Sequence, residues 1–582
     1  MNKQPSAQGA IKRLDSLYEF DRAPVSGDRL CGGGYFAGSF AGEHVAATEF
    51  VIGALFVTWG ASVKDVVVGL AIGNLLAVLS WALVCAPIAV ETRMTLYWYL
   101  RKIGGPVFTL IYNVLNAVLF CILAGCMITV SASAVRLLFD QIPRQTEWYP
   151  THWGFVLVVL LVGAVVVVLA IAGFKRLATF ASVCAPWMLI MFLAGFLVML
   201  PRLGAETGVG PVNSFARFWE VGQKAVWTGR VPGGGPPEIG FWHVAAFAWI
   251  CNLAMHMGLS DMALFRYARH SAYGLFSFFG MFLGHYLAWI WAGVMGAGAA
   301  LILETPLTEL DSGAVAYSVL GVAGAVAVVI AGWTTSNPTL YRAGLALQAV
   351  TPNWPRWAVT LVAGTVTTVI ACFPFVFKEL LNFVGLYGLL LVPAGAIVVT
   401  EHWIFPKIGM QRYWSSARGQ NLNRPALLAW VSGMALALGL WLTDTVHLFF
   451  LFLPVYVLTA LVYIALAALG GARKDSAECG LPGDGEEAAE RVPSRTGPIA
   501  PCSSGGKSQS PWRSRTVSQV SALLALAALG ACVVMPCVVY LSDYDTYSES
   551  MDWFKKWLII PTLVYFLTGT IWQITRKKER AA

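Results

Sequence analysis

Three ionisable residues lie close together near the start of the first long apolar run of the chain. Glu43 and His44 belong to residues 38–45, which read Gly-Ser-Phe-Ala-Gly-Glu-His-Val, and Glu49 follows inside the run. An ionisable group is costly in hydrocarbon, so it usually faces a cavity or a partner. Glu43 and Glu49 are therefore candidates to carry a proton. Alternatively, Glu43 and His44 are solvated at the membrane interface, and His285, in a later run, is a packing residue.

A second interruption falls in the sixth predicted span, over residues 249–258. There Asn252, His256 and a glycine interrupt an otherwise apolar stretch. Many transporters consist of two inverted five-helix repeats whose first helices are discontinuous, and their unwound backbone meets ion and substrate at the midplane. The two interruptions therefore predict two broken helices around a binding site. Beyond the second break, Asp261 and Arg266 are predicted to pair at the inner mouth of the protein.

The composition predicts the elements that position these residues. The chain is 57% hydrophobic and 12% charged, whereas an ordinary soluble domain has about 25% charged residues. About fourteen apolar runs reach the roughly 20 residues that a helix needs to cross a bilayer. The runs are continuous and lack the alternation of a transmembrane barrel, so helices are expected. The sequence predicts an all-α polytopic membrane protein.

The basic residues predict the orientation and the membrane partner. Most of the 39 Lys and Arg residues fall in segments on one side if both termini are cytoplasmic, as the positive-inside rule requires. The net charge of +8 then reflects topology and affinity for anionic lipid. No basic patch is interleaved with aromatic residues as in nucleic-acid-binding proteins. We expect a multi-pass plasma-membrane protein that binds no nucleic acid.

Several short stretches occur in an order that resembles one family. They are Trp-Gly-Ala-Ser at 59–62, Gly-Asn-Leu-Leu at 73–76, Gly-Phe-Lys-Arg-Leu at 173–177, Arg-Tyr-Ala at 266–268, Trp-Thr-Thr-Ser-Asn-Pro-Thr-Leu-Tyr-Arg-Ala-Gly-Leu at 333–345 and Leu-Asn-Phe-Val-Gly-Leu-Tyr-Gly at 381–388. This ordered set is similar to the nucleobase-cation symporters, which include cytosine, uracil, allantoin and hydantoin permeases. The resemblance spans roughly residues 15 to 470.

The resemblance implies a LeuT-like fold with a core of two inverted repeats of five helices. The apolar runs add about four further helices, and the last two of these lie outside the resemblance. The predicted parts of the chain, in order, are a cytoplasmic tail at 1–42, a ten-helix core at 43–401, helices 11 and 12 at 402–470, a linker at 471–516 and two extra helices with a basic tail at 517–582. The linker is rich in Gly, Pro, Ser, Glu and Arg without apolar periodicity, so we expect disorder there.

The resemblance also implies a sodium site between the first and eighth spans. It assigns the hydroxyls of Thr334 and Thr335, the carbonyl of Ala331, and backbone carbonyls around Ala41 to His44. Sodium is a hard cation, and neutral oxygens beside an unwound helix hold it without burying another formal charge. Alternatively, the two threonines only bond back to their own helix. No other cofactor is expected.

For the substrate, the family stacks a planar ring between aromatic residues of the third and sixth spans. The residues available here are Phe120 and Trp249, with the amide of Asn252 nearby; Gly42 at the first break and Asn337 in the eighth span complete the candidate set. The chain departs from the family because its third span lacks the usual tryptophan. Alternatively, the two aromatic residues only pack or face lipid.

These observations predict a secondary transporter that couples a cation, sodium by this resemblance, to symport of a nucleobase or related small heterocycle by alternating access. The alternatives are a LeuT-like sodium symporter of another organic solute and a nutrient sensor derived from a transporter. A membrane-embedded enzyme is disfavoured because the short loops lack clustered carboxylates or histidines for metal or acid-base chemistry. The sequence leaves the oligomeric state open.

Overall fold

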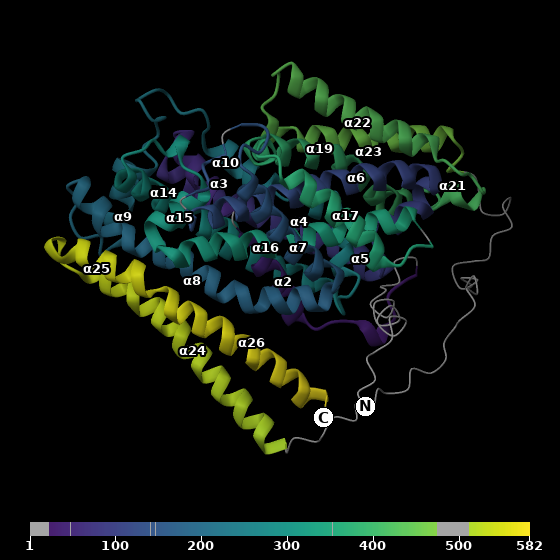
Figure 1. Ribbon diagram of the computed structural model, residues 1–582. Coiled ribbons are helices and arrows are strands. Elements are labelled where there is room, and N and C mark those ends of the chain that lie inside the picture. The colour runs from purple at the N-terminus through teal and green to yellow at the C-terminus, as the bar shows by residue number, and fades with distance from the viewer. Residues whose placement is uncertain are drawn as a thin grey trace.

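The computed structural model describes residues 23–46, 48–139, 141–145, 147–351, 353–473 and 511–581. Most of the predicted N-terminal tail (1–22) and of the predicted linker (474–510) lies outside these residues. The described chain is built of helices, and no β-sheet forms within it (Figure 1).

Ten of the described helices are long and apolar enough to cross a membrane, and the count is eleven if the bent pair α2–α3 forms one span. The other predicted spans correspond to α10, α16 and α17. The all-α polytopic prediction is therefore confirmed.

Two groups of helices pack mainly among themselves. The α6 group comprises α6 (Leu96–Arg136), α7 (Trp153–Ile171), α16 (Val322–Val350) and α17 (Arg356–Ala371). The α2 group comprises α2 (Gly33–His44), α3 (Thr48–Thr58), η2 (Asp65–Gly69), α4 (Leu70–Ser80), η3 (Trp81–Cys85), α5 (Ala86–Thr92), α10 (Phe241–Ile250), α11 (Leu253–His256), α12 (Met262–Phe265), η5 (Ser271–Ser277), α13 (Phe278–Gly280), η6 (Met281–Ala288) and α14 (Trp289–Leu303). The break in the first span lies where these two groups meet, because α2 also packs on α16.

The remaining helices surround the two groups. They are η1 (Gly27–Arg29), α8 (Phe174–Glu206), α9 (Phe215–Val221), η4 (Gly222–Val226), η7 (Leu307–Glu309), α15 (Ser312–Leu320), α18 (Phe375–Lys378), α19 (Leu380–Val399), η8 (Thr400–Ile404), α20 (Phe405–Lys407), α21 (Trp414–Ala417), α22 (Arg424–Leu442), η9 (Leu448–Phe450), α23 (Phe452–Leu469), α24 (Pro511–Leu541), α25 (Tyr544–Trp557) and α26 (Ile559–Ala581). Helices α19, α22 and α23 pack together on one side, and α8 packs against both α2 and α16.

Local sequence explains where several of these helices begin and bend. The Thr95 hydroxyl accepts a hydrogen bond from the Trp98 N–H and so caps α6. Within α6, Gly105 has φ +78° and is followed by a proline, so the helix is kinked there. A side chain at Gly105 would also crowd the Asn421 carbonyl. Asn423 caps α22 in the same way as Thr95 caps α6.

The first span is broken at the end of the predicted stretch 38–45, and not at its two glycines. Helix α2 continues through Gly38 and Gly42 to His44, and the chain leaves helical geometry at Val45 before α3 turns away by 53°. The two glycines have another role, because a Cβ at either position would overlap α8, at Ala181 in the case of Gly42. They allow α2 and α8 to pack closely.

The second predicted break is present in the sixth span. Helix α10 ends at Ile250, Asn252 leaves helical geometry, and only the single turn of α11 follows. Leu259 then adopts a left-handed conformation with φ +67° before α12 begins. Residues 249–258 are thus interrupted as the sequence predicted.

The apolar run at residues 313–336, one of the fourteen counted in the sequence, does not form one helix. Helix α15 is short, and Gly321, with φ +61°, turns the chain into α16, which runs to Val350. The apolar run at 313–336 is continuous in sequence, so hydropathy alone could not reveal this corner. Lys555 of α25 lies against the corner, where its carbonyl would meet a Cβ on Gly321.

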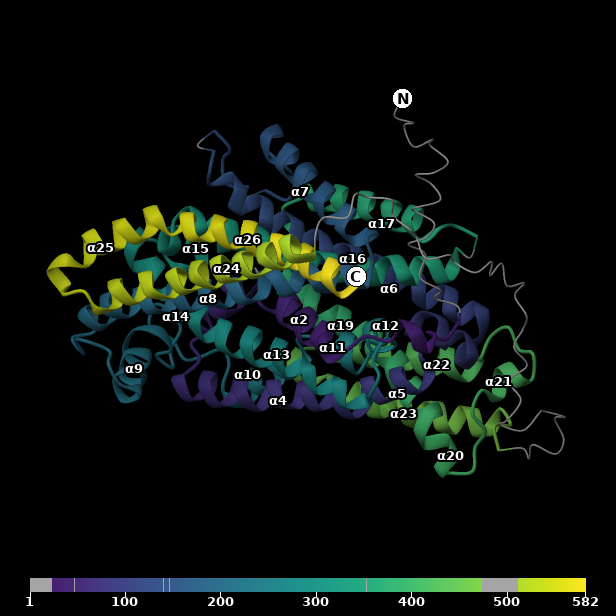
Figure 2. The same ribbon diagram turned by 90° about the horizontal axis from the view of Figure 1, so that it is seen from below.

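The last three helices form a hairpin against α8 on the outside of the bundle (Figures 1 and 2). Helix α8 contains Pro186 and Pro201, and each proline removes a backbone donor from the helix. The indole N–H of Trp187 donates to the Thr562 hydroxyl of α26 at 3.1 Å. The hairpin is therefore joined to α8 by polar contacts as well as by apolar packing.

Two tyrosines of the hairpin bond to α8 backbone near its prolines. Tyr565 donates to the Val183 carbonyl at 2.6 Å, and Tyr547 donates to the Val198 carbonyl at 2.8 Å. Each of these carbonyls follows the carbonyl, of Ser182 or Leu197, that loses its helical donor to a proline. The hairpin thus adds hydrogen bonds at both irregular points of α8.

We expect the double variant Tyr547→Phe/Tyr565→Phe to be less stable than the natural protein. Side-chain hydrogen bonds in membrane proteins contribute about 0.6 kcal/mol each on average, so the loss is about 1 kcal/mol. Thermal unfolding of the purified protein in detergent measures it. Tyr317→Phe is the control, because Tyr317 is an exposed tyrosine of α15. An unchanged melting temperature in the double variant would contradict this prediction.

Candidate functional site

A cavity of ≈ 60 Å³ lies at the break between α2 and α3. This space holds roughly four to six waters, so only a small solute fits without side-chain rearrangement. Its lining residues are Glu43, His44, Thr48, Glu49, Ile52, Leu123, Met127, Cys251, Asn252, Met255, His285, Thr335, Thr339, Leu380, Val384 and Tyr387. Both helix breaks and both packing groups contribute to this lining. We call this space the central cavity.

The end of α2 forms one wall of the central cavity. Glu43 is 4% exposed and His44 is 3% exposed, so the alternative that they are solvated at an interface is wrong. Nδ1 of His44 lies 2.9 Å from the Phe40 carbonyl oxygen. The His44 ring also packs near the His285 ring, with centroids 5.1 Å apart.

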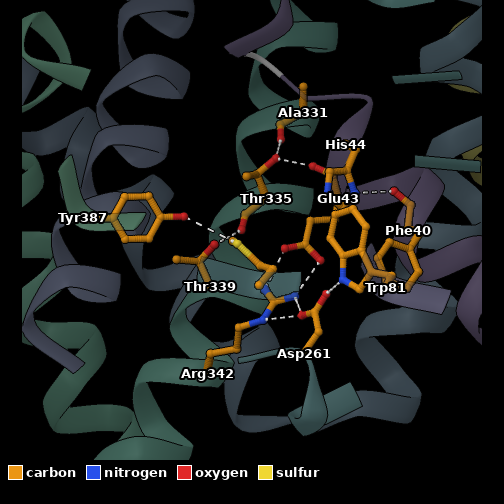
Figure 3. A network of polar contacts seen from close by, with 11 residues as sticks. Phe40, Glu43, His44, Trp81, Asp261, Ala331, Thr335, Thr339, Arg342 and Tyr387 are labelled. Carbon is orange, nitrogen blue, oxygen red and sulfur yellow. Dashed lines mark hydrogen bonds and ion pairs between the residues drawn. The ribbon is translucent and has the colours of Figure 1, made fainter. Parts of the chain in front are cut away.

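Oxygen atoms of α2 and α16 meet beside the central cavity (Figure 3). The Thr335 hydroxyl lies 3.0 Å from the Glu43 carbonyl oxygen and 3.1 Å from the Ala331 carbonyl oxygen. The Thr334 hydroxyl lies 3.0 Å from the same Ala331 carbonyl. Both threonines do bond back to α16, as the alternative held, but Thr335 also reaches α2. These neutral oxygens are of the kind that a sodium ion prefers.

Within the predicted range Ala41 to His44, the α2 carbonyls lie in different surroundings. The Ala41 carbonyl accepts the Val45 N–H at 3.1 Å, within the last turn of α2. The His44 carbonyl lies against Gly284, where an added Cβ would overlap it. The Glu43 carbonyl is the one that approaches α16. The sequence could not single out the Glu43 carbonyl, because the direction in which a carbonyl points depends on the residue at which the helix ends.

A buried charge network joins the two packing groups next to the central cavity (Figure 3). The Arg342 guanidinium donates to both carboxylate oxygens of Glu43, at 2.6 and 3.1 Å. It also donates to one oxygen of Asp261, at 3.0 and 2.5 Å. The Trp81 indole donates to the other oxygen of Asp261 at 2.7 Å. One guanidinium thus bridges the first broken span and the sixth-span region.

This network corrects the predicted pairing of Asp261 with Arg266. The Arg266 guanidinium lies 3.1 Å from the Tyr267 hydroxyl and 3.4 Å from the Tyr341 hydroxyl, whereas Asp261 pairs with Arg342. Arg342 lies in the motif at 333–345, but nothing in its local sequence shows which carboxylate it meets.

Glu49 lies in the first turn of α3 and lines the central cavity while being almost fully buried. Its carboxylate accepts hydrogen bonds from the Trp289 indole and from the Thr48 hydroxyl, the latter at 3.2 Å. Nε2 of His285 lies 3.8 Å from the same carboxylate, and the His285 ring stacks on Trp289. His285 therefore both packs, as predicted, and lines the central cavity.

The aromatic candidates for substrate binding do not line the central cavity. The Trp249 indole donates to the Ser80 hydroxyl at 3.0 Å, on the side of α4. Phe120 is buried edge-on to Tyr387, with centroids 6.0 Å apart. Tyr387 is the aromatic residue that faces the cavity, and its hydroxyl lies 3.5 Å from the Met255 sulfur. Its place in the tenth-span motif at 381–388 could have indicated it.

Of the other three substrate candidates, one lines the central cavity and two do not. Asn252 lines the central cavity at the second break. Gly42 instead packs against Ala181 of α8. Asn337 is buried in α16, outside the cavity lining, and its side-chain amide has no hydrogen-bond partner within the described residues.

A second cavity of ≈ 390 Å³ adjoins the central cavity. It is lined mainly by α3, by the segment leading into α15, and by Leu380 of α19, which also lines the central cavity. Leu380 is therefore a lining residue that the two cavities share.

Comparisons with known proteins show the fold. No protein-family model matches the chain, and no curated protein matches it by sequence. One similar structure is that of Mhp1, a nucleobase-cation-symport-1 family transporter, in a closed conformation with bromovinylhydantoin bound: TM-score 0.59, 17% identity, 79% of this chain and 98% of that chain. An inward-facing structure of Mhp1 is also similar: TM-score 0.56, 17% identity, 78% of this chain and 94% of that chain.

A sodium-coupled sialic acid symporter in a substrate-bound outward-open state is similar as well: TM-score 0.58, 13% identity, 80% of this chain and 97% of that chain. At these identities the likeness concerns the fold alone. The chain therefore has the LeuT-like fold that its sequence predicted, the fold it shares with the nucleobase-cation-symport-1 transporter Mhp1.

Proposed function

We propose that this protein is a secondary transporter in the plasma membrane that couples entry of sodium to uptake of a small heterocycle. The observation that carries the proposal is the central cavity, which lies where two broken helices meet and beside the oxygens shared by α2 and α16. Both termini are cytoplasmic in this proposal. Solved transporters of the same fold support symport. In this proposal the solute crosses the membrane chemically unchanged.

The coupling ion in this proposal binds between α2 and α16. The Glu43 and Ala331 carbonyls and the hydroxyls of Thr334 and Thr335 supply its oxygens. Thr335 also lines the central cavity, so an ion there would lie next to the solute. Each would then favour binding of the other, and the loaded protein would rock the α2 group against the α6 group.

The energy of this coupling is sufficient for accumulation. Moving one charge across 100 mV releases about 2.3 kcal/mol, which sustains roughly a fifty-fold solute gradient. A sodium concentration gradient adds to this value. One sodium ion per solute is therefore enough for uphill uptake.

Uptake into proteoliposomes tests the function. We expect labelled cytosine to accumulate when sodium is outside and the interior is negative, and not when choline replaces sodium. A proton gradient imposed without sodium is the comparison arm, since Glu43 and Glu49 are the candidates for proton coupling. Uptake driven by protons alone would replace sodium as the coupling ion. No uptake of any such heterocycle under either gradient would reject the proposed function.

A further inference from the structure

Three buried polar atoms of the central cavity lack a hydrogen-bond partner within the described chain. They are Nε2 of His44, Nδ2 of Asn252 and Nδ1 of His285. All three side chains are more than nine-tenths buried. A buried polar atom without a partner is costly, so such atoms usually meet a ligand or an ordered water. All three atoms belong to residues that line one small cavity, and this indicates a built binding site.

The hydrogen bond of His44 determines what its free nitrogen can do. Nδ1 faces the Phe40 carbonyl oxygen, which can only accept, so Nδ1 carries a hydrogen. In the neutral imidazole, Nε2 is then a bare acceptor. His44 therefore offers an acceptor to a molecule in the central cavity.

Glu49 adds further acceptors to the same cavity. An ionised carboxylate has about four lone-pair sites. The Trp289 indole and the Thr48 hydroxyl occupy one site on each oxygen. Each oxygen accepts one hydrogen bond in the structure, so the carboxyl group has acceptor capacity left for a ligand.

Carboxylates outnumber cations at and beside the central cavity, where Glu43, Glu49 and Asp261 are accompanied by Arg342. Its lining includes two glutamates and two histidines, and none of its lining residues is a lysine or arginine. The nearby Arg342 guanidinium is bound by Glu43 and Asp261. An anionic solute would meet carboxylates without a free counter-charge, whereas N–H donors or a cation would be complementary.

We propose, resting on the transport function proposed above, that the solute is a small single-ring amino-heterocycle or amidine, neutral or cationic. Its N–H groups donate to Glu49 and to Nε2 of His44, and the Asn252 amide donates to a ring acceptor. The size of the central cavity limits the solute to one ring. Solutes with only oxo groups at these positions, and carboxylates, are excluded by their unmatched acceptors.

Binding of paired probes to the full-length protein in nanodiscs with sodium tests this inference. Cytosine and uracil have similar size, but cytosine carries an exocyclic amino group; benzamidine and benzoate form a pair of opposite charge. We expect cytosine to bind at least about 10-fold more tightly than uracil, because a site built to hydrogen-bond a group rejects a partner that lacks it. We expect benzamidine to compete with cytosine and benzoate not to compete.

Two variants connect the selectivity to the named groups. Glu49→Gln should weaken cytosine binding by about 10- to 100-fold while uracil binding changes little. His44→Phe keeps a ring beside Phe40 but removes the acceptor Nε2. This variant should also bind cytosine more weakly, with little change in uracil binding. Glu220→Gln is the control, because Glu220 pairs with Lys224 at an exposed site. Thermal unfolding shows whether each variant is folded.

The outcomes separate the two proposals. Sodium-dependent binding that is equal or tighter for uracil or benzoate would overturn the amino-solute inference and leave symport intact. Failure of all four probes to bind, with or without sodium, would overturn both. The comparison of cytosine with uracil uses the natural protein, so it holds even if a variant fails to fold.

Discussion

Arg342→Met is expected to abolish solute uptake and to lower stability more than any other single change discussed here. The substitution keeps an unbranched side chain but leaves the Glu43 and Asp261 carboxylates buried without their common guanidinium. Removing one partner of a buried ion pair costs about 3–5 kcal/mol. Thermal unfolding and the yield of folded protein in detergent measure the loss of stability, and proteoliposome uptake measures the loss of function.

A triple variant that removes all three charges distinguishes two effects of losing Arg342: the instability caused by unpaired buried carboxylates and the loss of the ionic link during transport. In Arg342→Met/Glu43→Gln/Asp261→Asn no buried charge is left unpaired, so stability should return close to that of the natural protein. Uptake should stay low if the ionic link between the two packing groups is needed for the transport cycle. Lys224→Met, in an exposed pair, should change stability by less than about 1 kcal/mol. A stable, active Arg342→Met single variant would show that the network is dispensable.

Thr335→Val is expected to have the second-largest effect, on sodium dependence. Valine has the shape of threonine without the hydroxyl that lies between the Glu43 and Ala331 carbonyls. Interactions of a polar group with a charge are worth about 1.5–3 kcal/mol, so the sodium concentration for half-maximal uptake should rise roughly 10- to 150-fold. Uptake measured over a sodium titration, with choline keeping ionic strength constant, gives this value.

Thr365→Val is the matched control for this experiment. The Thr365 hydroxyl bonds only back to the Leu361 carbonyl on the exposed side of α17, so its removal should leave sodium dependence unchanged. An unchanged sodium requirement in Thr335→Val would place the ion elsewhere. A fall in uptake at all sodium concentrations, with the half-maximal value unchanged, would indicate damage to folding instead.

The spans and the second break could be predicted because both depend on local composition. Long apolar runs require helices in a bilayer, and polar residues such as Asn252 interrupt them where a cavity exists. The exact position of the first break could not be predicted, because Gly38 and Gly42 resemble helix breakers in sequence although α2 continues through both. In the structure they are contact points with α8, and sequence alone does not distinguish these two uses of glycine.

The charge network could not be predicted because its partners are distant in sequence. Asp261 and Arg342 are separated by 81 positions, and Glu43 and Arg342 by 299. Arg266 is much closer to Asp261 along the chain, so it was the obvious partner. The pairing is decided by how α16 crosses the two broken spans, which is a property of the assembled bundle.

The solute-facing residues were partly predicted. Glu43, His44, Glu49 and Asn252 attracted attention because polar groups are expensive in an apolar run, and all four line the central cavity. An aromatic residue carries no such signal, because aromatic side chains also pack and face lipid. The sequence therefore does not distinguish Trp249 from a residue that lines the cavity. In the structure its indole donates to Ser80, away from the central cavity.

The contacts of the terminal hairpin with α8 affect how a truncation that removes the hairpin should be interpreted. A chain ending at residue 470 would lack the tyrosines that bond to α8 beside its two prolines, and would expose those carbonyls and the Trp187 indole to lipid, which offers no replacement partner. Loss of uptake on truncation would then follow from a weakened fifth span, whether or not the hairpin signals to another protein. Single replacements of Tyr547 or Tyr565 by phenylalanine leave the helices in place. They therefore distinguish better whether the hairpin regulates transport or only stabilises the fold.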